Sequence, residues 1–389
     1  MTTSKGVYDV IVIGAGIEGS SSAYNLVKQG LRVLLLDQFP LPHSRGSSHG
    51  QSRITRYVYE DEFYVRMMVD AFPLWSRLEQ ESGVELFTNC GVLDIRRGGC
   101  PGMRRALDAL RAHNIPHESL SSPELQRRFP VLTTGQGDVA IWDPNGGLLR
   151  ADQALRAFQT VFKQLGGVIH DNEPVTSVTP GSQVVIATTK SVYTSANVVF
   201  AAGPWSGPLC ASVGLHLPLK PIRISVFYWR ASDDYREMYG SSQFPCFIDS
   251  RGGGSHFHTY GLPISEYPGL VKVCPHEGPS IDPDDRDKGT DDSWTEEGTL
   301  ATVKSTFKGL ATTPSIREYC IYTETPDKHP FLDQHPRFPN IIVAAGFSGH
   351  GFKLAPVIGK AVTELVLKKV PTYNMKPFKI DRFEPRSHL

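Results

Sequence analysis

Short runs of consecutive apolar residues recur at the beginning, in the middle and near the end of the chain. Residues 10–13, 33–36, 198–202 and 341–345 are wholly apolar. Uninterrupted runs of this length are typical of strands in a parallel sheet that is covered on both faces. We therefore expect one largely parallel sheet assembled from three distant parts of the chain.

Segments with a helical period of apolar positions accompany these runs. Apolar residues recur at this period over 61–81, 154–165 and 354–366. We expect Asp152 to be the N-cap of the second helix, because a carboxylate there accepts from free backbone N–H groups. Pro73 lies inside the first segment and removes one backbone donor, so a kink or an interruption is expected there.

Glycines follow the first apolar run in the spacing of a dinucleotide-binding turn. Gly14, Gly16 and Gly19 form G-x-G-x-x-G, which permits a tight turn, close approach to a pyrophosphate and close helix packing. Asp37 ends the second run, eighteen residues after Gly19, where a carboxylate accepts from ribose hydroxyls. This stretch predicts a dinucleotide site, and by itself it leaves NAD and FAD open.

Other segments show the patterns of antiparallel strands. Three short strands are expected over 174–178, 184–188 and 191–194, and residues 221–272 alternate and are rich in aromatic side chains. The fold class is therefore α/β, or α+β overall: a Rossmann-like domain with an inserted, mainly antiparallel-sheet substrate domain. The boundaries that we expect are 1–88, 149–220 and 325–389 for the discontinuous Rossmann-like domain, and 89–148 and 221–324 for the substrate domain.

Composition excludes several classes of partner. The 40 basic and 40 acidic residues balance, so no general attraction to nucleic acid or to an anionic membrane is expected. No apolar run approaches the roughly 18 residues that a membrane span needs, and the polar N-terminus does not resemble a signal peptide. The six cysteines lack C-x-x-C spacing, which argues against a zinc site and a disulfide framework. We expect no metal.

Two polar, glycine-rich loops carry candidate cationic groups. Arg53 and Arg56 lie three residues apart after the first β-α-β unit, and guanidinium groups suit recognition of a carboxylate or of flavin oxygens. His350 and Lys353 lie at the last strand-to-helix junction, where backbone N–H groups stabilise anionic charge. The alternatives are an ordinary surface loop and a simple glycine turn.

A third group of candidates lies near the end of the alternating region. Lys272 and His276 share a strand face, but Pro275 between them limits regular pairing. A lysine inside a pocket could attract oxygen or superoxide electrostatically, and the favoured alternative is an exposed lysine. His256 and His258 also share a face, yet no third metal ligand accompanies them.

Taken together, these segments resemble the monomeric sarcosine oxidase family of flavoproteins over essentially the whole chain. The stretches that carry the resemblance are DVIVIGAGIEG, PHSRGSSHGQSRITR, AAGPW, YGLP, GLVKV with a following histidine, CIYTETPD and AAGFSGHGFKLAP. The resemblance implies a Rossmann-like FAD-binding domain and FAD joined covalently to the sulfur of Cys320. Pro275 departs from the family pattern.

The resemblance also assigns residues to roles. It implies that Arg56 and Lys353 bind the substrate carboxylate, and that Lys272 activates oxygen close to Arg53 and the flavin. The pocket residues that shape the amine site would be Tyr260, His276, Tyr322 and His350. Residues implied to bind the cofactor are Gly14, Gly16, Gly19, Asp37, Ser47, Ser48, His49, Cys320, Gly346 and Gly349.

The expected reaction is FAD-dependent oxidation of a secondary amino acid, such as sarcosine, L-pipecolate or L-proline, to an imine, with O2 reduced to H2O2. The alternatives are a FAD dehydrogenase with another electron acceptor, a NAD-dependent dehydrogenase and a non-catalytic dinucleotide-binding protein. The C-terminal tripeptide Ser387-His388-Leu389 resembles a peroxisomal address read by the import receptor. A monomer in the peroxisome is therefore expected.

Overall fold

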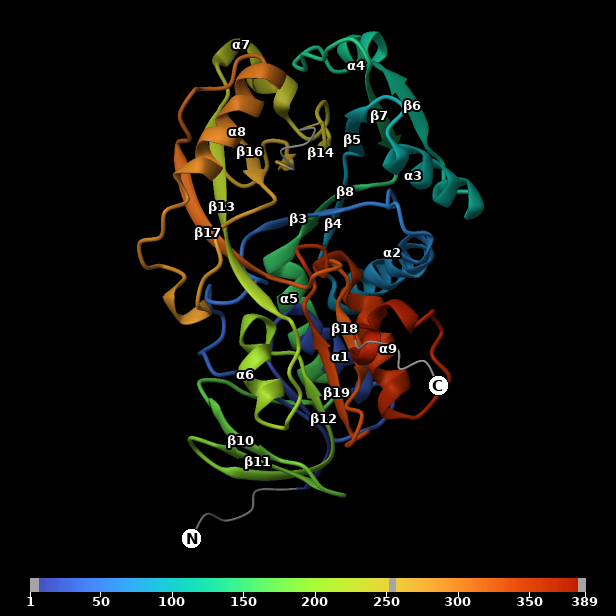
Figure 1. Cartoon of the computed structure of the whole chain (residues 1–389), viewed down its shortest axis with the longest axis vertical. Helices are drawn as coiled ribbons and strands as arrows, with labels where there is room; N and C mark the ends of the chain where they lie inside the picture. Colours follow the sequence, from blue (N-terminus) through green and yellow to red (C-terminus); the bar gives the residue numbers. More distant parts are fainter. Residues whose placement is uncertain (1–6, 252–256, 384–389) are drawn as a thin grey trace.

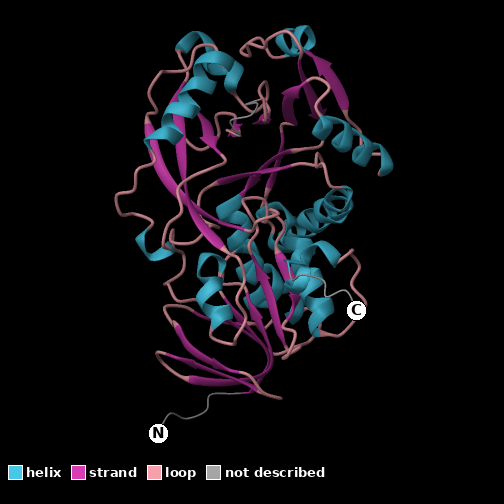
Figure 2. Ribbon diagram, viewed as in Figure 1, coloured by secondary structure: helices cyan, strands magenta, loops and turns pink. Residues whose placement is uncertain are grey.

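The computed structural model describes residues 7–251 and 257–383. Over these residues the chain forms an elongated molecule with two large sheets, one in each half of the view in Figure 1, joined by a small third sheet. Figure 2 shows that helices cover the lower sheet closely, whereas the long strands of the upper half are flanked by fewer helices. Ser387-His388-Leu389 and His256 lie outside the described residues.

The first sheet has the order β10-β11-β12-β1-β2-β9, and β19 adds to β12 and pairs with β18. Its strands are β1 (Val7–Ile13), β2 (Val33–Leu36), β9 (Val168–His170), β10 (Val175–Thr179), β11 (Val184–Thr188), β12 (Val192–Phe200), β18 (Phe331–Gln334) and β19 (Ile341–Ala345). β1 pairs in parallel with β12 and β2, and β12 pairs in parallel with β19. The expected parallel sheet from three parts of the chain is confirmed.

The second sheet has the order β17-β13-β16-β15-β14-β5-β7-β6. Its strands are β5 (Val92–Arg97), β6 (Glu118–Ser121), β7 (Asp138–Asp143), β13 (Lys220–Arg230), β14 (Cys246–Asp249), β15 (Thr259–Leu262), β16 (Leu270–Pro275) and β17 (Ile316–Glu324). Its pairs are antiparallel except β14 with β5, which are parallel. The predicted antiparallel character is confirmed.

A small antiparallel sheet connects the two halves and consists of β3 (Ser52–Thr55), β8 (Gly147–Arg150) and β4 (Phe87–Asn89). The expected domain borders at 88/89 and 148/149 fall inside β4 and β8. The two large sheets support the two-domain division, which we keep as a proposal.

The helices are α1 (Ile17–Val27), α2 (Glu62–Ser82), α3 (Pro101–Ala112), α4 (Ser122–Arg128), α5 (Ala151–Gln164), α6 (Ser206–Ala211), α7 (Asp233–Arg236), α8 (Ser293–Thr306) and α9 (Ala355–Val366). α1 packs against α5 and α9, and α2 packs against α5 and α9. Together with the apolar residues on one face of the first sheet they form the largest hydrophobic core. The opposite face is covered by a second core, to which β10, β11 and α6 contribute.

Two local predictions are wrong, and a third is narrowed. α2 runs through Pro73 without an interruption, because packing of its buried face on neighbouring helices outweighs one lost backbone bond; a kink at Pro73 stays a prediction. Arg150, at the end of β8, is the N-cap of α5, and Asp152 lies inside the first turn. Strands expected separately near 191–194 and 198–202 form one strand, β12, because the intervening residues also pair with β1.

Candidate active site

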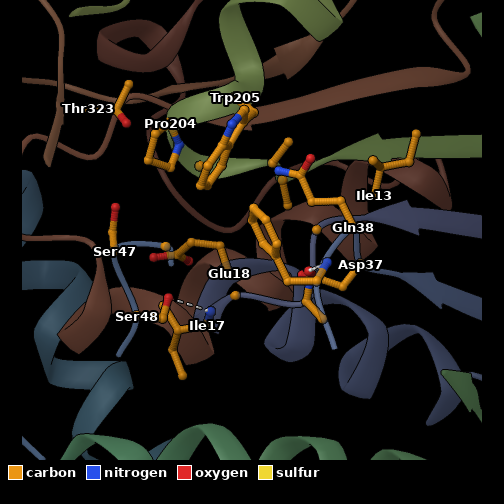
Figure 3. Close-up of a pocket in the computed structure, with 18 of the residues that line it drawn as sticks. Ile13, Ile17, Glu18, Asp37, Gln38, Ser47, Ser48, Pro204, Trp205 and Thr323 are labelled. Carbon is orange, nitrogen blue, oxygen red and sulfur yellow. Dashed lines mark hydrogen bonds between the residues drawn. The ribbon is translucent and has the colours of Figure 1, made fainter. Parts of the chain in front are cut away.

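The predicted dinucleotide turn lines a cavity of about 460 Å³ at the carboxyl ends of β1 and β2 (Figure 3). Gly14 has φ +104°, and a Cβ on it would lie 2.4 Å from the Ala201 carbonyl oxygen. A Cβ on Gly19 would lie 1.8 Å from the Gly14 carbonyl oxygen. These two positions therefore require glycine, so that strand, turn and helix can approach closely.

Polar groups hold the rim of this cavity in place. One Asp37 oxygen accepts from the backbone N–H of Ala15 at 2.7 Å, and the other accepts from Phe39 at 2.9 Å. The Ser48 hydroxyl accepts from the backbone N–H of Ile17 at 2.9 Å, at the start of α1. The helix start thus faces the cavity, where its partial positive charge suits a pyrophosphate.

Glu18 places a carboxyl group inside this cavity. Neither of its side-chain oxygens has a hydrogen-bond partner among the described residues, and burial raises the pKa of Glu18 well above its ordinary value. In Figure 3 the group points toward the side of the cavity that Ser47 and Ser48 form. A Cβ on Gly351 would lie 2.7 Å from Glu18 Oε1, so the last strand-to-helix junction adjoins the first turn. Buried polar atoms normally have hydrogen-bond partners, so the free Glu18 oxygens on this cavity wall are consistent with a polar ligand that binds there.

The loop that carries Ser47 and His49 is fixed to β3 through Arg53. The Arg53 guanidinium donates to the carbonyl oxygens of Ser47, His49 and Ser52 at 2.7–2.8 Å. His49 lies within 3.1 Å of the Tyr319 carbonyl oxygen through Nε2, and burial lowers its pKa to about 4. This segment therefore folds back over the cavity. It is not the ordinary surface loop that was the alternative expectation.

A second cavity of about 480 Å³ adjoins the first. The two share the residues His49, Arg53, Tyr322, Gly349 and Phe352 on their walls. A dinucleotide in the first cavity can therefore present one end to a small molecule in the second.

Cationic groups gather on one wall of the second cavity. The Arg56 guanidinium lies 4.4 Å from the centre of the Tyr59 ring, and the Lys353 ammonium lies 5.9 Å from it. Arg56 Nη1 is 4.0 Å from Asp94 Oδ2, while Arg56 Nε has no hydrogen-bond partner among the described residues. Burial lowers the pKa of Lys353 well below its ordinary value, and the charges of Arg56 and Arg53 add to this effect. Such a cluster favours an anionic ligand.

Two histidines that line the second cavity are neutral. Burial, with the charge of Lys353, lowers the pKa of His276 and of His350 to about 3. His350 Nε2 lies 2.9 Å from the Lys328 carbonyl oxygen, which makes Nε2 the donor and leaves Nδ1 as an acceptor. His350 Nδ1 is buried without a partner among residues 7–251 and 257–383. It can accept a hydrogen bond from an amine.

Tyrosine rings complete the wall beside His276. The ring centres of Tyr260 and Tyr322 lie 6.1 Å and 5.3 Å from that of His276. β16 stays paired up to Pro275, which faces Thr259, and the backbone N–H of His276 donates to His258 at 2.9 Å. Pro275 therefore does not turn His276 away from the cavity.

Lys272 is buried on the cavity wall and not exposed. Its ammonium lies 2.9 Å from Glu266 Oε1, and the side chains of both residues are at most 7% exposed. Glu266 also accepts from Ser52 and, at 2.8 Å, from the Tyr228 hydroxyl. Burial by itself would raise the pKa of Glu266, but the charge of Lys272 and these hydrogen bonds hold it below its ordinary value.

Cys320 lies on β17 where the two cavities meet. Its sulfur is 3.7 Å from the Ser47 carbonyl oxygen, and the next residues on β17, Ile321 and Tyr322, line the first cavity. Gly346 and Gly349 adopt φ of +77° and +80° in the same region, and a Cβ on Gly349 would lie 2.5 Å from the Tyr322 ring. The structure thus places the predicted site residues on the walls of two adjoining cavities, except Gly19, which lines neither cavity and packs against Gly14 behind the turn.

Sequence reasoning missed three residues of this site. Glu18 occupies a variable position of the glycine motif, and Tyr59 follows the arginine loop without any local pattern. Glu266 lies in a turn between β15 and β16 and meets Lys272 only through the sheet register. A charge search of the motif would have found Glu18, whereas no local signal marks the other two.

Two further searches of the described ranges 7–251 and 257–383 gave negative results. No group of three or more His, Cys, Asp or Glu side chains in these ranges is arranged to hold a metal ion. No helix in the same ranges combines the length and the apolar composition that a membrane crossing requires.

Comparisons with known proteins agree with this geometry. The family described as DAO, FAD dependent oxidoreductase, matches residues 9–365. Peroxisomal sarcosine oxidases of Mus musculus and Homo sapiens are 45% and 44% identical to the chain, over 100% of it and 100% of each relative. The solved structure of NikD, an unusual amino acid oxidase, superposes with a TM-score of 0.83 at 21% identity, covering 96% of this chain and 98% of that one.

These matches confirm the expected resemblance to sarcosine oxidases and the mixed α/β class with a FAD-binding fold. They agree with the cavity that the glycine turn lines. The chain belongs to the DAO family of FAD-dependent oxidoreductases.

Proposed function

We propose that this protein oxidises secondary amino acids with FAD and reduces O2 to H2O2. The observation that carries the proposal is the buried group of Arg56, Lys353 and the Tyr59 ring beside the cofactor cavity. Arg56 has only a long 4.0 Å pairing with Asp94, and burial lowers the pKa of Lys353, so a substrate carboxylate that pairs with both would stabilise their positive charges. The relatives named sarcosine oxidase support an N-alkyl amino acid as the substrate.

The residues of the second cavity would orient this substrate. Arg56 and Lys353 bind its carboxylate, and His350 Nδ1 accepts a hydrogen bond from its amine. Because both cavity histidines stay neutral above about pH 4, they add no positive charge next to the amine. Tyr260, His276 and Tyr322 form a wall that excludes water from the carbon to be oxidised.

FAD fits the first cavity. The glycine turn with Asp37, Ser47, Ser48 and His49 would hold it, and Gly346 and Gly349 would leave room for its ring. When bound, the cofactor would supply the redox chemistry, taking up the two electrons that the substrate loses as its amine becomes an imine and passing them to dioxygen. Cys320, at the junction of the cavities, supports a covalent link through its sulfur, as the family resemblance implies.

Lys272 favours an oxidase over a dehydrogenase that uses another acceptor. A buried ammonium on the cavity wall would attract the negative charge that builds on dioxygen as it is reduced. Arg53, which lines both cavities, would add to this positive potential.

A substrate panel tests the function. Sarcosine, L-pipecolate, L-proline and glycine are compared by peroxide release, and at least one secondary amino acid should give turnover above glycine. Arg56→Gln should raise KM by about 10- to 150-fold, the worth of a charge-assisted bond of about 1.5–3 kcal/mol. Arg111→Gln, an exposed arginine paired with Asp108, is the matched control and should leave KM unchanged. The proposal fails if no secondary amino acid yields peroxide, or if Arg56→Gln behaves like the control.

The cellular location that we propose is the peroxisome, as the names of the mammalian relatives suggest. A fluorescent protein that ends in Ser387-His388-Leu389 should enter peroxisomes, and the same fusion without Leu389 should not. We also propose a monomer, for which light scattering should give a mass near 42.9 kDa.

A further inference from the structure

Two cysteines meet at the border between the small sheet and the second large sheet. Cys90 follows β4, and Cys246 is the first residue of β14. β14 lies beside β5 (Figure 1), and in this pair Cys246 is opposite Val92. The backbone N–H of Cys246 donates to the Gly91 carbonyl oxygen at 3.1 Å. This register holds the two sulfur atoms 3.7 Å apart, although 156 residues separate them in the sequence.

The two thiols have unequal surroundings. Cys246 is fully buried, and burial raises its pKa well above the ordinary value. Cys90 is half-buried, and the hydrogen bond from the Cys246 thiol lowers its pKa. Cys90 is therefore the more nucleophilic and more accessible sulfur, and Cys246 is placed behind it as its partner.

This pair adjoins the substrate cavity. Cys246 belongs to an apolar cluster with Ile54 and Leu262, and Cys90 packs against the same cluster. Ile54, Leu262 and Ile248, the last being two residues after Cys246 on β14, line the cavity. The charge of Lys272 also reaches Cys246, where it favours the thiolate. Peroxide released in this cavity would therefore arise one layer of side chains away from the pair.

We propose that Cys90 and Cys246 are a peroxide-oxidisable dithiol that closes to a disulfide behind the wall of the substrate cavity. The source of peroxide rests on the proposed function; the pair itself does not. In the first step the Cys90 thiolate attacks H2O2, so that a sulfur–oxygen bond forms, the oxygen–oxygen bond breaks and the leaving hydroxide takes up a proton to become water. In the second step Cys246 sulfur attacks Cys90 sulfur, the sulfur–oxygen bond breaks and a second water leaves. Two thiols are oxidised, and one peroxide is reduced to two waters.

Closure changes the cavity wall. A disulfide has a sulfur–sulfur distance of about 2.0 Å, so the pair must approach by about 1.7 Å from 3.7 Å. That movement draws β14, with Ile248, toward the turn before β5. We expect KM for the amino acid substrate to change by at least about twofold when the disulfide forms, and to return to its original value when the disulfide is reduced.

The experiment treats the holoenzyme with added H2O2 and maps its peptides by mass spectrometry without reduction. The expected product is a cross-linked pair of peptides containing Cys90 and Cys246, two hydrogens lighter than the separate peptides and split again by dithiothreitol. Cys90→Ser and Cys246→Ser should abolish the product and the KM change while leaving the untreated enzyme's turnover unchanged. Cys100→Ser, at another half-buried thiol, is the matched control and should retain the cross-linked product and the KM change. If no cross-link between Cys90 and Cys246 forms, the proposal is overturned. If the cross-link forms but KM does not change, the proposed effect of the disulfide on the substrate cavity is overturned.

A second arm uses turnover instead of added peroxide. Enzyme supplied with a secondary amino acid in air should accumulate the cross-link, and catalase should prevent it. If peroxide is released but no cross-link forms, oxidation by the enzyme's own product is overturned. If no peroxide is released from any secondary amino acid, the proposed function fails, while added H2O2 still decides whether the dithiol closes.

Discussion

Replacing Lys272 by methionine removes one charge from the substrate cavity with little change in side-chain length. We expect two effects, one on stability and one on the reaction with oxygen. The Lys272 ammonium pairs with Glu266 at 2.9 Å, and both side chains are almost fully buried. Lys272→Met therefore leaves the Glu266 carboxylate, whose side chain is only 5% exposed, without its counter-charge.

The structure sets the size of the stability effect. Removing one partner of a buried ion pair costs about 3–5 kcal/mol. Glu266 keeps its hydrogen bonds from Ser52 and Tyr228, which places the expected loss near about 3 kcal/mol. In the wild type the depressed pKa of Glu266 gives stability that is present above its unfolded pKa and is lost as the pH falls. In Lys272→Met that pKa rises, so stability should instead be lost as the pH rises.

The effect on oxygen follows from the charge. A unit charge about 5 Å from the negative charge that builds on dioxygen is worth about 3 kcal/mol at an effective dielectric constant of about 20. The loss of this term slows the oxygen reaction by about two orders of magnitude. Reduction of the flavin by the amino acid should change far less, because the proposed binding site for the substrate carboxylate is elsewhere, at Arg56 and Lys353.

Rapid mixing separates these effects. Flavin absorbance is followed first during anaerobic reduction by substrate and then during reoxidation by dissolved oxygen, and urea unfolding gives the stability. The double variant Lys272→Met/Glu266→Gln removes the stranded carboxylate, so it should recover most of the stability while reoxidation stays slow. Lys379→Met, a half-exposed lysine paired with Asp333, is the control and should cost under about 1 kcal/mol. Reoxidation within threefold of wild type would refute the reasoning.

Three further outcomes are expected. Cys320→Ser should give a colourless pellet on acid precipitation where the wild type gives a yellow one, and a colourless wild-type pellet would contradict the covalent link. Because burial raises the pKa of Glu18, its contribution to stability is lost as the pH rises above the unfolded pKa. Glu18→Gln should therefore exceed the wild type in free energy of unfolding at pH 8 more than at pH 5, and equal differences at both would argue against a neutral Glu18. Gly19→Ala should bind less flavin, and its free energy of unfolding in urea should fall by about 3 kcal/mol, because its Cβ would lie 1.8 Å from the Gly14 carbonyl oxygen. Gly207→Ala is the control, and because open space surrounds Gly207 it should change neither the flavin content nor the free energy of unfolding.

Patterns within short stretches of sequence predicted those strands and turns that are determined by the residues of the stretch itself. The apolar runs that became β1, β2 and β19 are buried on both faces, and the glycine spacing determines the turn after β1 whatever the rest of the chain does. The helix boundary at Asp152 was wrong because the start of α5 depends on where β8 ends, and β8 is fixed by pairing with β3 and β4.

In the candidate site, too, residue types could be predicted from the sequence, whereas contacts between distant segments could not. Arg56 and Lys353 could be singled out by residue type, but their meeting over Tyr59 depends on packing between segments almost 300 residues apart. The pairing of Lys272 with Glu266 depends on the register of β15 and β16 and on Ser52 in a different sheet. No periodicity in the sequence encodes such contacts, so they became visible only in three dimensions.

The order of strands in the first sheet has a consequence for how the protein is made. β1 emerges from the ribosome first, yet its neighbour β12 ends at residue 200, and β19, which completes the wall next to Gly346, ends at residue 345. Early stretches of chain therefore wait for late ones before the sheet can close. The dinucleotide cavity should be absent from nascent chains until the residues of β19 and the following Gly346 have been synthesised. Cofactor loading is thus a step that follows translation, and a prematurely terminated chain should remain colourless.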